Sequence, residues 1–141
     1  MTRGRGAAAA NAARGEHQLI LGGRTYRLRP AHTALMAIEE ETDSSVLALV
    51  RLGNAGELRL KQLGIIGAEL IRAGAEEKDE LTRAVDAERI GEMIQEQGIP
   101  GATSVFTLCL LDAATGGCTA SGEAKAAPAK APKAGTPAGA A

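Results

Sequence analysis

Apolar and polar residues alternate along two short runs near the start of the chain, HQLIL at 17–21 and RTYRL at 24–28. Alternation with a period of two is the pattern of a half-buried β-strand. Gly22 and Gly23 separate the runs. A two-residue Gly-Gly link favours a tight hairpin turn, because such a turn needs positive φ values that glycine adopts at least cost. The pattern therefore predicts an antiparallel hairpin.

The turn also fixes the register of this hairpin. It places Leu21 opposite Arg24 and, at the open end, His17 opposite Leu28. Four side chains then form one apolar face: Leu19, Leu21, Tyr26 and Leu28. A lone hairpin is marginally stable in water, so we expect helices to cover this face.

Beyond Pro30, which ends the second strand, the apolar spacing changes from two to three or four and predicts helices. The predicted helices cover about 31–42, 45–52, 60–73, 87–97 and 102–115. We expect the charged stretch 75–85 to be a loop or a single helical turn. The expected N-caps of the second and fourth helices are Asp43-Ser44 and Asp86.

Three glycines mark the third predicted helix. Gly64 and Gly67 lie in its interior, where glycine costs roughly 1 kcal/mol relative to alanine. They indicate that another element approaches closely, and we expect that element to be the hairpin. Gly74 is the expected C-cap.

An acidic cluster, Glu39–Glu41, lies at the end of the first predicted helix, where carboxylates oppose the helix dipole. The cluster is interpreted either as an acidic docking patch or as a solvated face that a nearby arginine offsets.

Composition divides the chain into three parts. The sequence predicts a disordered N-terminal arm at 1–16, a single hairpin-plus-helices domain at 17–116, and a disordered Ala/Pro/Lys-rich tail at 117–141. Neither end has enough apolar residues to offset the entropy of ordering. The expected fold class is α+β, mostly α, with the hairpin packed on about four to five short helices.

The net charge of −1 is unevenly distributed. The two ends are basic, whereas the part between them carries ten basic and fifteen acidic residues. An acidic core with one Tyr, one Phe and no Trp argues against nucleic-acid binding, which needs a basic face and stacking aromatics. No apolar run is long enough to span a membrane. Cys109 is expected in the core, and thiols without a disulfide pattern fit a reducing cytoplasm.

No residue pattern indicates a catalytic, cofactor or metal site. His17 and His32, the two histidines, lie at the open end of the hairpin and in the first helical turn, without metal-site spacing. Gly22-Gly23 precedes a strand rather than a helix, so it is not a phosphate loop. Asp86-Ala87-Glu88 is interpreted as a helix start rather than an acid–base pair. We therefore expect a protein that is not an enzyme.

The run LILGGRTYRLRPAHTALMAIEEETDSSVLAL, at 19–49, resembles the tail assembly chaperone family of gene transfer agents and long-tailed phages, often described as tail tube proteins. The matching segments are Leu21-Gly22-Gly23, Tyr26-Arg27-Leu28-Arg29, Ile38-Glu39, Thr42 and Ser44-Ser45-Val46-Leu47. The likeness covers roughly residues 17–115. The charged segment Glu76–Arg83 and the Ala/Pro/Lys tail depart from the family pattern.

This resemblance implies a cytoplasmic protein of a bacterial host that binds the tape measure protein and assists tail tube assembly. It further implies that the tail tube protein is a partner, that a homo-oligomer forms on the tape measure, and that the chain is absent from the mature particle. Neither nucleic acid nor a membrane is an implied partner. Part of the apolar stripe on Ala102–Thr115 or Leu60–Ala73 would be exposed for a partner helix; alternatively, both stripes are core.

Two other classes of protein stay open. One is a permanent structural component of the tail, a tail tube or tail terminator-like protein, although a tube subunit normally needs more β-structure than one hairpin. The other is a small regulatory or DNA-associated helical protein, against which the acidic core argues.

Overall fold

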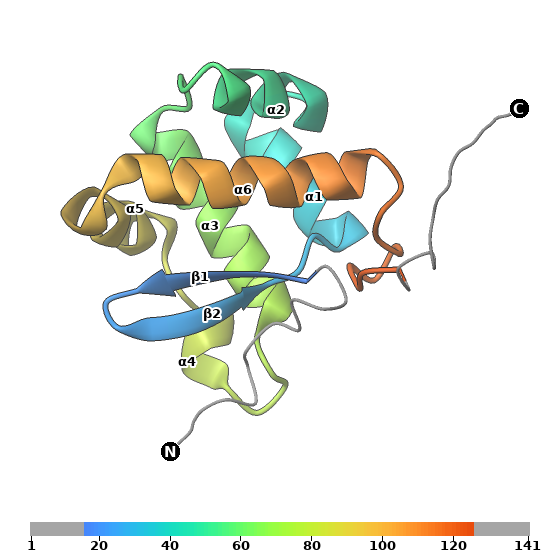
Figure 1. Ribbon diagram of the computed structural model, residues 1–141. Coiled ribbons are helices and arrows are strands. Elements are labelled where there is room, and N and C mark those ends of the chain that lie inside the picture. The colour runs from blue at the N-terminus through green and yellow to red at the C-terminus, as the bar shows by residue number, and fades with distance from the viewer. Residues whose placement is uncertain (1–15, 126–141) are drawn as a thin grey trace, which may run out of the picture.

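The computed structural model describes residues 16–125 (Figure 1). The elements in chain order are β1 (His17–Leu21), β2 (Arg24–Leu28), α1 (His32–Thr42), α2 (Val46–Asn54), α3 (Leu60–Gly74), α4 (Glu80–Arg83), α5 (Ala87–Gln97) and α6 (Ile99–Ala114). The fold is mostly helical with one N-terminal hairpin, as the sequence predicts. Residues 1–15 of the predicted arm (1–16) and residues 126–141 of the predicted tail (117–141) lie outside the described residues.

The hairpin has the predicted register. Leu21 pairs with Arg24 and His17 with Leu28, and the strands run antiparallel. Gly22 and Gly23 have φ values of 58° and 79°, which are the left-handed values that the turn requires. The predicted apolar face, Leu19, Leu21, Tyr26 and Leu28, is buried. This face packs toward the helices, as expected for a hairpin that is not stable alone.

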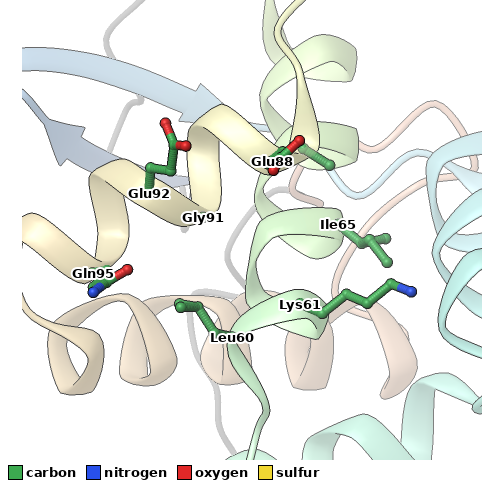
Figure 2. A pocket seen from close by; sticks show the side chains of 8 residues that line it. Leu60, Lys61, Ile65, Glu88, Gly91, Glu92 and Gln95 are labelled. Atoms are coloured by element: carbon green, nitrogen blue, oxygen red, sulfur yellow. The ribbon is translucent and has the colours of Figure 1, made fainter.

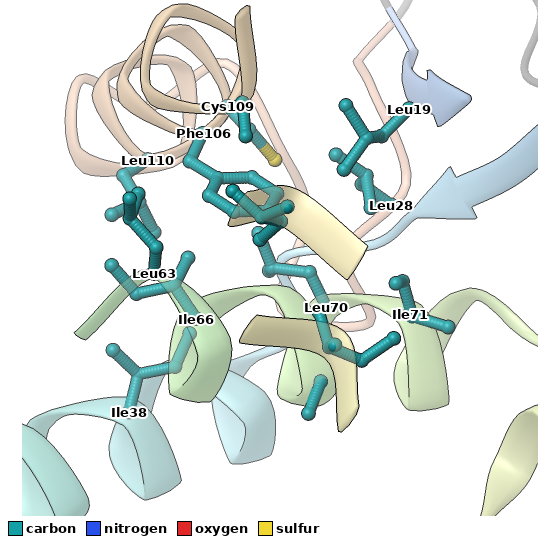
Figure 3. Close-up of a cluster of buried hydrophobic side chains, with 14 of the residues drawn as sticks. Leu19, Leu28, Ile38, Leu63, Ile66, Leu70, Ile71, Phe106, Cys109 and Leu110 are labelled. Atoms are coloured by element: carbon teal, nitrogen blue, oxygen red, sulfur yellow. The ribbon is translucent and has the colours of Figure 1, made fainter. Parts of the chain in front are cut away.

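Helix α3 runs through the middle of the molecule and contacts β2, α1, α4, α5 and α6. Its apolar side chains Leu63, Ile66, Leu70 and Ile71 have no solvent exposure. They meet Phe106, Cys109 and Leu110 from α6 and Ile38 from α1 in one core (Figure 3). Burial of each large aliphatic side chain contributes about 1.5–3 kcal/mol, so α3 anchors the fold.

The glycines of α3 do mark close approaches, but with other partners than expected. A Cβ on Gly64 would lie 2.5 Å from the Ala87 carbonyl oxygen, and one on Gly67 would lie 2.9 Å from Ile90 and from Phe106. These neighbours belong to α5 and α6, so the expected contact with the hairpin is wrong for both residues. The reason is that both glycines lie on the sides of α3 that face these two helices.

The hairpin instead approaches α3 at Gly74. A Cβ there would lie 2.1 Å from the Arg27 carbonyl oxygen. Gly74 is the last residue of the helix, and the C-cap is Ala75 in an extended conformation, so the predicted C-cap role is wrong. Gly74 is needed for space rather than for a left-handed turn.

The connection between α1 and α2 differs from the predicted cap. Asp43 has a φ of 53° and ends α1 as its left-handed C-cap, whereas Ser45 is the N-cap of α2. The Ser45 hydroxyl accepts a hydrogen bond from Ala48 N at 3.0 Å, and Glu39 Oε2 accepts one from Val46 N at 2.9 Å. The Asp86 N-cap of α5 is confirmed, since Asp86 Oδ2 accepts from Arg89 N at 3.1 Å.

The charged stretch 75–85 forms the single turn α4. Asp79 caps this turn, accepting from Thr82 N at 3.1 Å. Arg24 of the hairpin donates to Asp79 Oδ2 at 2.9 Å and to Thr82 Oγ1 at 2.8 Å. The pKa of Asp79 is lowered chiefly by the two hydrogen bonds that Thr82 donates to its carboxylate, and further by Arg24. The turn is thereby tied to β2.

Helix α6 begins at Ile99, three residues before the predicted start. Pro100 lies in the first turn of the helix. A proline is well tolerated there, because an N–H in the first turn has no intrahelical acceptor. Across residues 16–125, no helix combines the length and apolar content that crossing a bilayer requires.

Residues 117–125, expected as the start of the disordered tail, fold back onto the domain. Cys118 and Ala124 form an isolated antiparallel bridge, and His32 N donates to the Ala120 carbonyl at 2.8 Å. Gly122, with a φ of 91°, is buried against Ala31. Main-chain hydrogen bonds therefore order this segment without large apolar side chains.

Candidate partner-binding surface

The two apolar stripes proposed from the sequence have different positions. The stripe on α3 is core, because Leu63, Ile66, Leu70 and Ile71 are fully buried. Helix α6 has both a core side and a free side. Its core side consists of Ala102, Phe106, Cys109 and Leu110.

On the opposite side of α6, Leu108 is 58% exposed and Leu111 is 37% exposed, and half-buried Val105 lies at their edge. Spacings of three residues place these side chains on neighbouring turns of one face. No charged residue occurs from Ile99 to Leu111. We call Val105, Leu108 and Leu111 the α6 stripe. This helix lies along the front of the molecule in Figure 1.

A third side of α6 is closed by α2. The Thr107 hydroxyl donates to the Thr103 carbonyl at 2.7 Å, and both threonines are buried. Gly53 of α2 lies directly over Thr107, since a Cβ on Gly53 would lie 1.9 Å from Thr107 Oγ1. The buried hydroxyl is satisfied within its own helix, so this contact is part of the fold. Leu47, at the start of α2, is exposed.

The acidic cluster Glu39–Glu41 contributes two carboxylates to local structure. Glu39 caps α2, as described above. Glu41 faces Glu69 of α3. The pKa of Glu69 is raised mainly by partial burial and, to a smaller extent, by the neighbouring Glu41 carboxylate. Arg72 donates to Glu69 Oε2 at 3.0 Å and opposes the rise. Arg72 therefore offsets Glu69, and within residues 16–125 no arginine forms an ion pair with the cluster itself.

His17 and Cys118 both lie beside Asp112 of α6. His17 Nε2 is 3.3 Å from Asp112 Oδ2, and Cys118 Sγ is 4.0 Å from the same oxygen. Burial raises the pKa of both the Cys118 and the Cys109 thiols. His32 is exposed at the start of α1. Within the described part of the chain, no group of three or more His, Cys, Asp or Glu side chains is placed to hold a metal ion.

Sequence analysis missed a groove that lies between α3 and α5. Its volume is about 520 Å³, and its lining consists of Leu60, Lys61, Ile65, Ala87, Glu88, Gly91, Glu92 and Gln95 (Figure 2). Gly64 lets the two helices approach closely beside this groove, because a Cβ on Gly64 would lie 2.5 Å from the Ala87 carbonyl oxygen. Gly91 inside the predicted helix was a signal for such an approach.

The comparisons with known proteins return one family. The family model described as phage tail tube protein, GTA-gp10, matches residues 14–98, which is more than half of the chain. The matched region contains the hairpin and α1 to α5 and ends before α6. No curated protein and no solved structure matches the chain. The match confirms the expected relationship to phage and gene-transfer-agent tails. The chain therefore belongs to the family of phage tail tube proteins of the GTA-gp10 type.

Proposed function

We propose that this chain acts, without enzymatic activity, in forming the tail of a phage or gene transfer agent. Family membership over residues 14–98 carries this proposal. The family description names a tail tube protein, and it supports a structural component of the tail as the direct interpretation. A component of this kind stays in the finished particle.

A second candidate function within the same pathway is a tail assembly chaperone that acts in the host cytoplasm. Its partners would be the tape measure protein and the tail tube protein. The observation that favours it is the small amount of free β-structure. Tube subunits that assemble by strand pairing need open strand edges. Here a main-chain group on each side of the hairpin is already bonded within the chain. Arg29 N, just past β2, donates to the Leu70 carbonyl at 3.1 Å, and Gln97 Nε2 donates to the Ile20 carbonyl of β1.

The α6 stripe supports the chaperone candidate from another direction. A tape measure protein presents long amphipathic helices, which need their apolar faces covered. Leu108 and Leu111 offer an uncharged, apolar helix face of the kind that packs against such helices. In this proposal several copies of the chain coat one tape measure protein and are released as tube subunits arrive.

The first experiment is co-expression with the tape measure protein encoded nearby, followed by size-exclusion chromatography. The chaperone candidate expects a soluble complex with several copies of this chain. L108Q/L111Q is expected to lose the complex, whereas L81Q, which changes an 82% exposed leucine on α4, keeps it. A tape measure protein that stays insoluble beside the free wild-type chain contradicts the chaperone candidate.

The second experiment separates the two candidates by the composition of purified particles. Quantitative mass spectrometry that finds this chain in a fixed ratio to the other tail proteins supports a structural component. Its absence from particles, together with its presence in the lysate, supports a chaperone. Absence from both particles and tail-assembly complexes contradicts the tail proposal as a whole.

A further inference from the structure

We infer that the groove between α3 and α5 is a docking site for an amphipathic helix with basic residues along one flank. This inference goes beyond the proposed function, because it concerns one groove and one class of ligand. It stands whether the chain is a tail component or a chaperone, and its test uses the purified chain alone.

The floor of the groove is apolar. The apolar residues of the lining are Leu60 and Ile65 from α3 and Ala87 and Gly91 from α5. A Cβ on Gly91 would have its nearest neighbours at 3.8 Å, Gly64 Cα and the Leu60 carbonyl oxygen. The helix contact therefore does not require a glycine at this position. Because Gly91 has no side chain, the groove is deeper at this position and has room for side chains from a partner.

The walls of the groove differ in charge. Glu88 and Glu92 lie one turn apart on α5, both exposed, and Glu96 continues the same row. Arg89 Nη1 lies 3.1 Å from Glu92 Oε1, but both side chains are exposed. Exposed ion pairs contribute little to stability, so Glu92 can give up this pair for a cation of the partner. The α3 wall has a single charged side chain in the lining, Lys61. The groove thus presents a mainly acidic wall beside an apolar floor.

These features select the occupant. An apolar floor between two helices fits the apolar stripe of a third helix, packed as in other helix-in-groove complexes. The acidic α5 wall favours Lys or Arg on the flank that faces it and disfavours acidic residues there. The 11 residues of α5 correspond to a length of about 16 Å, enough for three turns of a bound helix.

The test uses a fluorescein-labelled helical peptide of about 14 residues, with leucines at i, i+3, i+4 and i+7 and lysines along one flank. Fluorescence anisotropy measures its binding to the full chain. E88K/E92K is expected to weaken binding about tenfold, since two attractions become repulsions. The matched control E40K/E76K, which has the same net charge and changes two exposed carboxylates outside the groove, is expected to bind like the wild type.

Two further measurements decide between charge recognition and non-specific adsorption. A peptide with glutamates in place of the lysines is expected to bind the wild type weakly and E88K/E92K more tightly. G91L, which fills the floor, is expected to abolish binding while circular dichroism reports an intact fold. Equal binding of the two peptides to the wild type, or equal loss with E88K/E92K and the control, overturns the inference.

Discussion

The side chain of Gln97, the last residue of α5, bridges the hairpin turn at Gly22. Its Oε1 accepts a hydrogen bond from Gly22 N at 3.2 Å, and its Nε2 donates to the Ile20 carbonyl. One amide thus satisfies a donor and an acceptor two residues apart, at the end of β1 and at the first residue of the turn. The two bonds connect residues that are about 75 positions apart in the sequence. They fix the tip of the hairpin to the end of α5.

Replacement of Gln97 by alanine is expected to lower the free energy of unfolding by about 1 kcal/mol, because each exposed hydrogen bond contributes at the low end of the usual range. Q97E is expected to be intermediate, since its carboxylate still accepts from Gly22 N but has no donor for Ile20. Urea denaturation measures both. The control is Q95A, two residues earlier on α5. Equal stability of Q97A and Q95A would show that the amide bridge contributes nothing.

Replacement of Gly74 by alanine is expected to destabilise the protein by about 2 kcal/mol or more, as overpacking does. The added Cβ would lie 2.1 Å from the Arg27 carbonyl oxygen, and main chain cannot move away as a flexible side chain does. Arg27 Nε also donates to the Gly74 carbonyl at 3.0 Å, so the same displacement weakens that bond. Thermal and urea unfolding measure the loss.

The matched control for this prediction is G101A in α6. A Cβ there meets nothing within 4 Å, so alanine is expected to be neutral or to stabilise by up to about 1 kcal/mol through helix propensity. A G74A variant as stable as the wild type would contradict the close approach of β2 and α3.

The features that follow from local sequence were predicted well. The Gly22-Gly23 turn and the two-residue period determine the register of the hairpin, and both signals lie within twelve residues. The bounds of α5 were also correct, because Asp86 caps one end and Gly98 follows the other. Each of these features depends on neighbours along the chain.

The features that were missed depend on neighbours in space. A glycine in a helix signals a close approach but does not name the partner, so Gly64 and Gly67 were assigned to the hairpin instead of α5 and α6. The segment 117–125 is held by main-chain bonds to residues such as His32, and its own side chains give no sign of them. The α3–α5 groove was missed because its lining comes from two helices, and the sequence of either helix does not show how closely the other approaches.

Glu69 is expected to make stability depend on pH. Burial and the neighbouring Glu41 raise the pKa of Glu69 above its ordinary value of 4.5, and Arg72 offsets part of the rise. A carboxyl with a raised pKa in the folded state binds its proton more tightly when folded. Its contribution to stability is therefore fully present below about pH 4.5 and is lost as pH rises through the folded-state pKa.

E69Q removes this titration while keeping a similar shape. The free energy of unfolding of E69Q is expected to fall less than that of the wild type as pH rises above 4.5. E40Q, which changes an exposed carboxylate on α1, is the control and should follow the wild type. Parallel curves for E69Q and the wild type would show that Glu69 has the same pKa in the folded and unfolded chains.

The two cysteines are expected to differ in reactivity. Cys109 is fully buried in the core, and Cys118 is partly exposed beyond α6. Burial raises the pKa of both thiols, and the Asp112 carboxylate raises that of Cys118 further. Because the thiolate is the reactive form, a thiol reagent should modify only Cys118, and slowly, in the folded protein. In denaturant it should modify both cysteines. C118S is expected to abolish modification of the folded protein. D112N is expected to accelerate modification of Cys118, because it removes the carboxylate that raises the pKa of this thiol. Rapid modification of two thiols in the folded protein would contradict the position of Cys109 between α6 and α3.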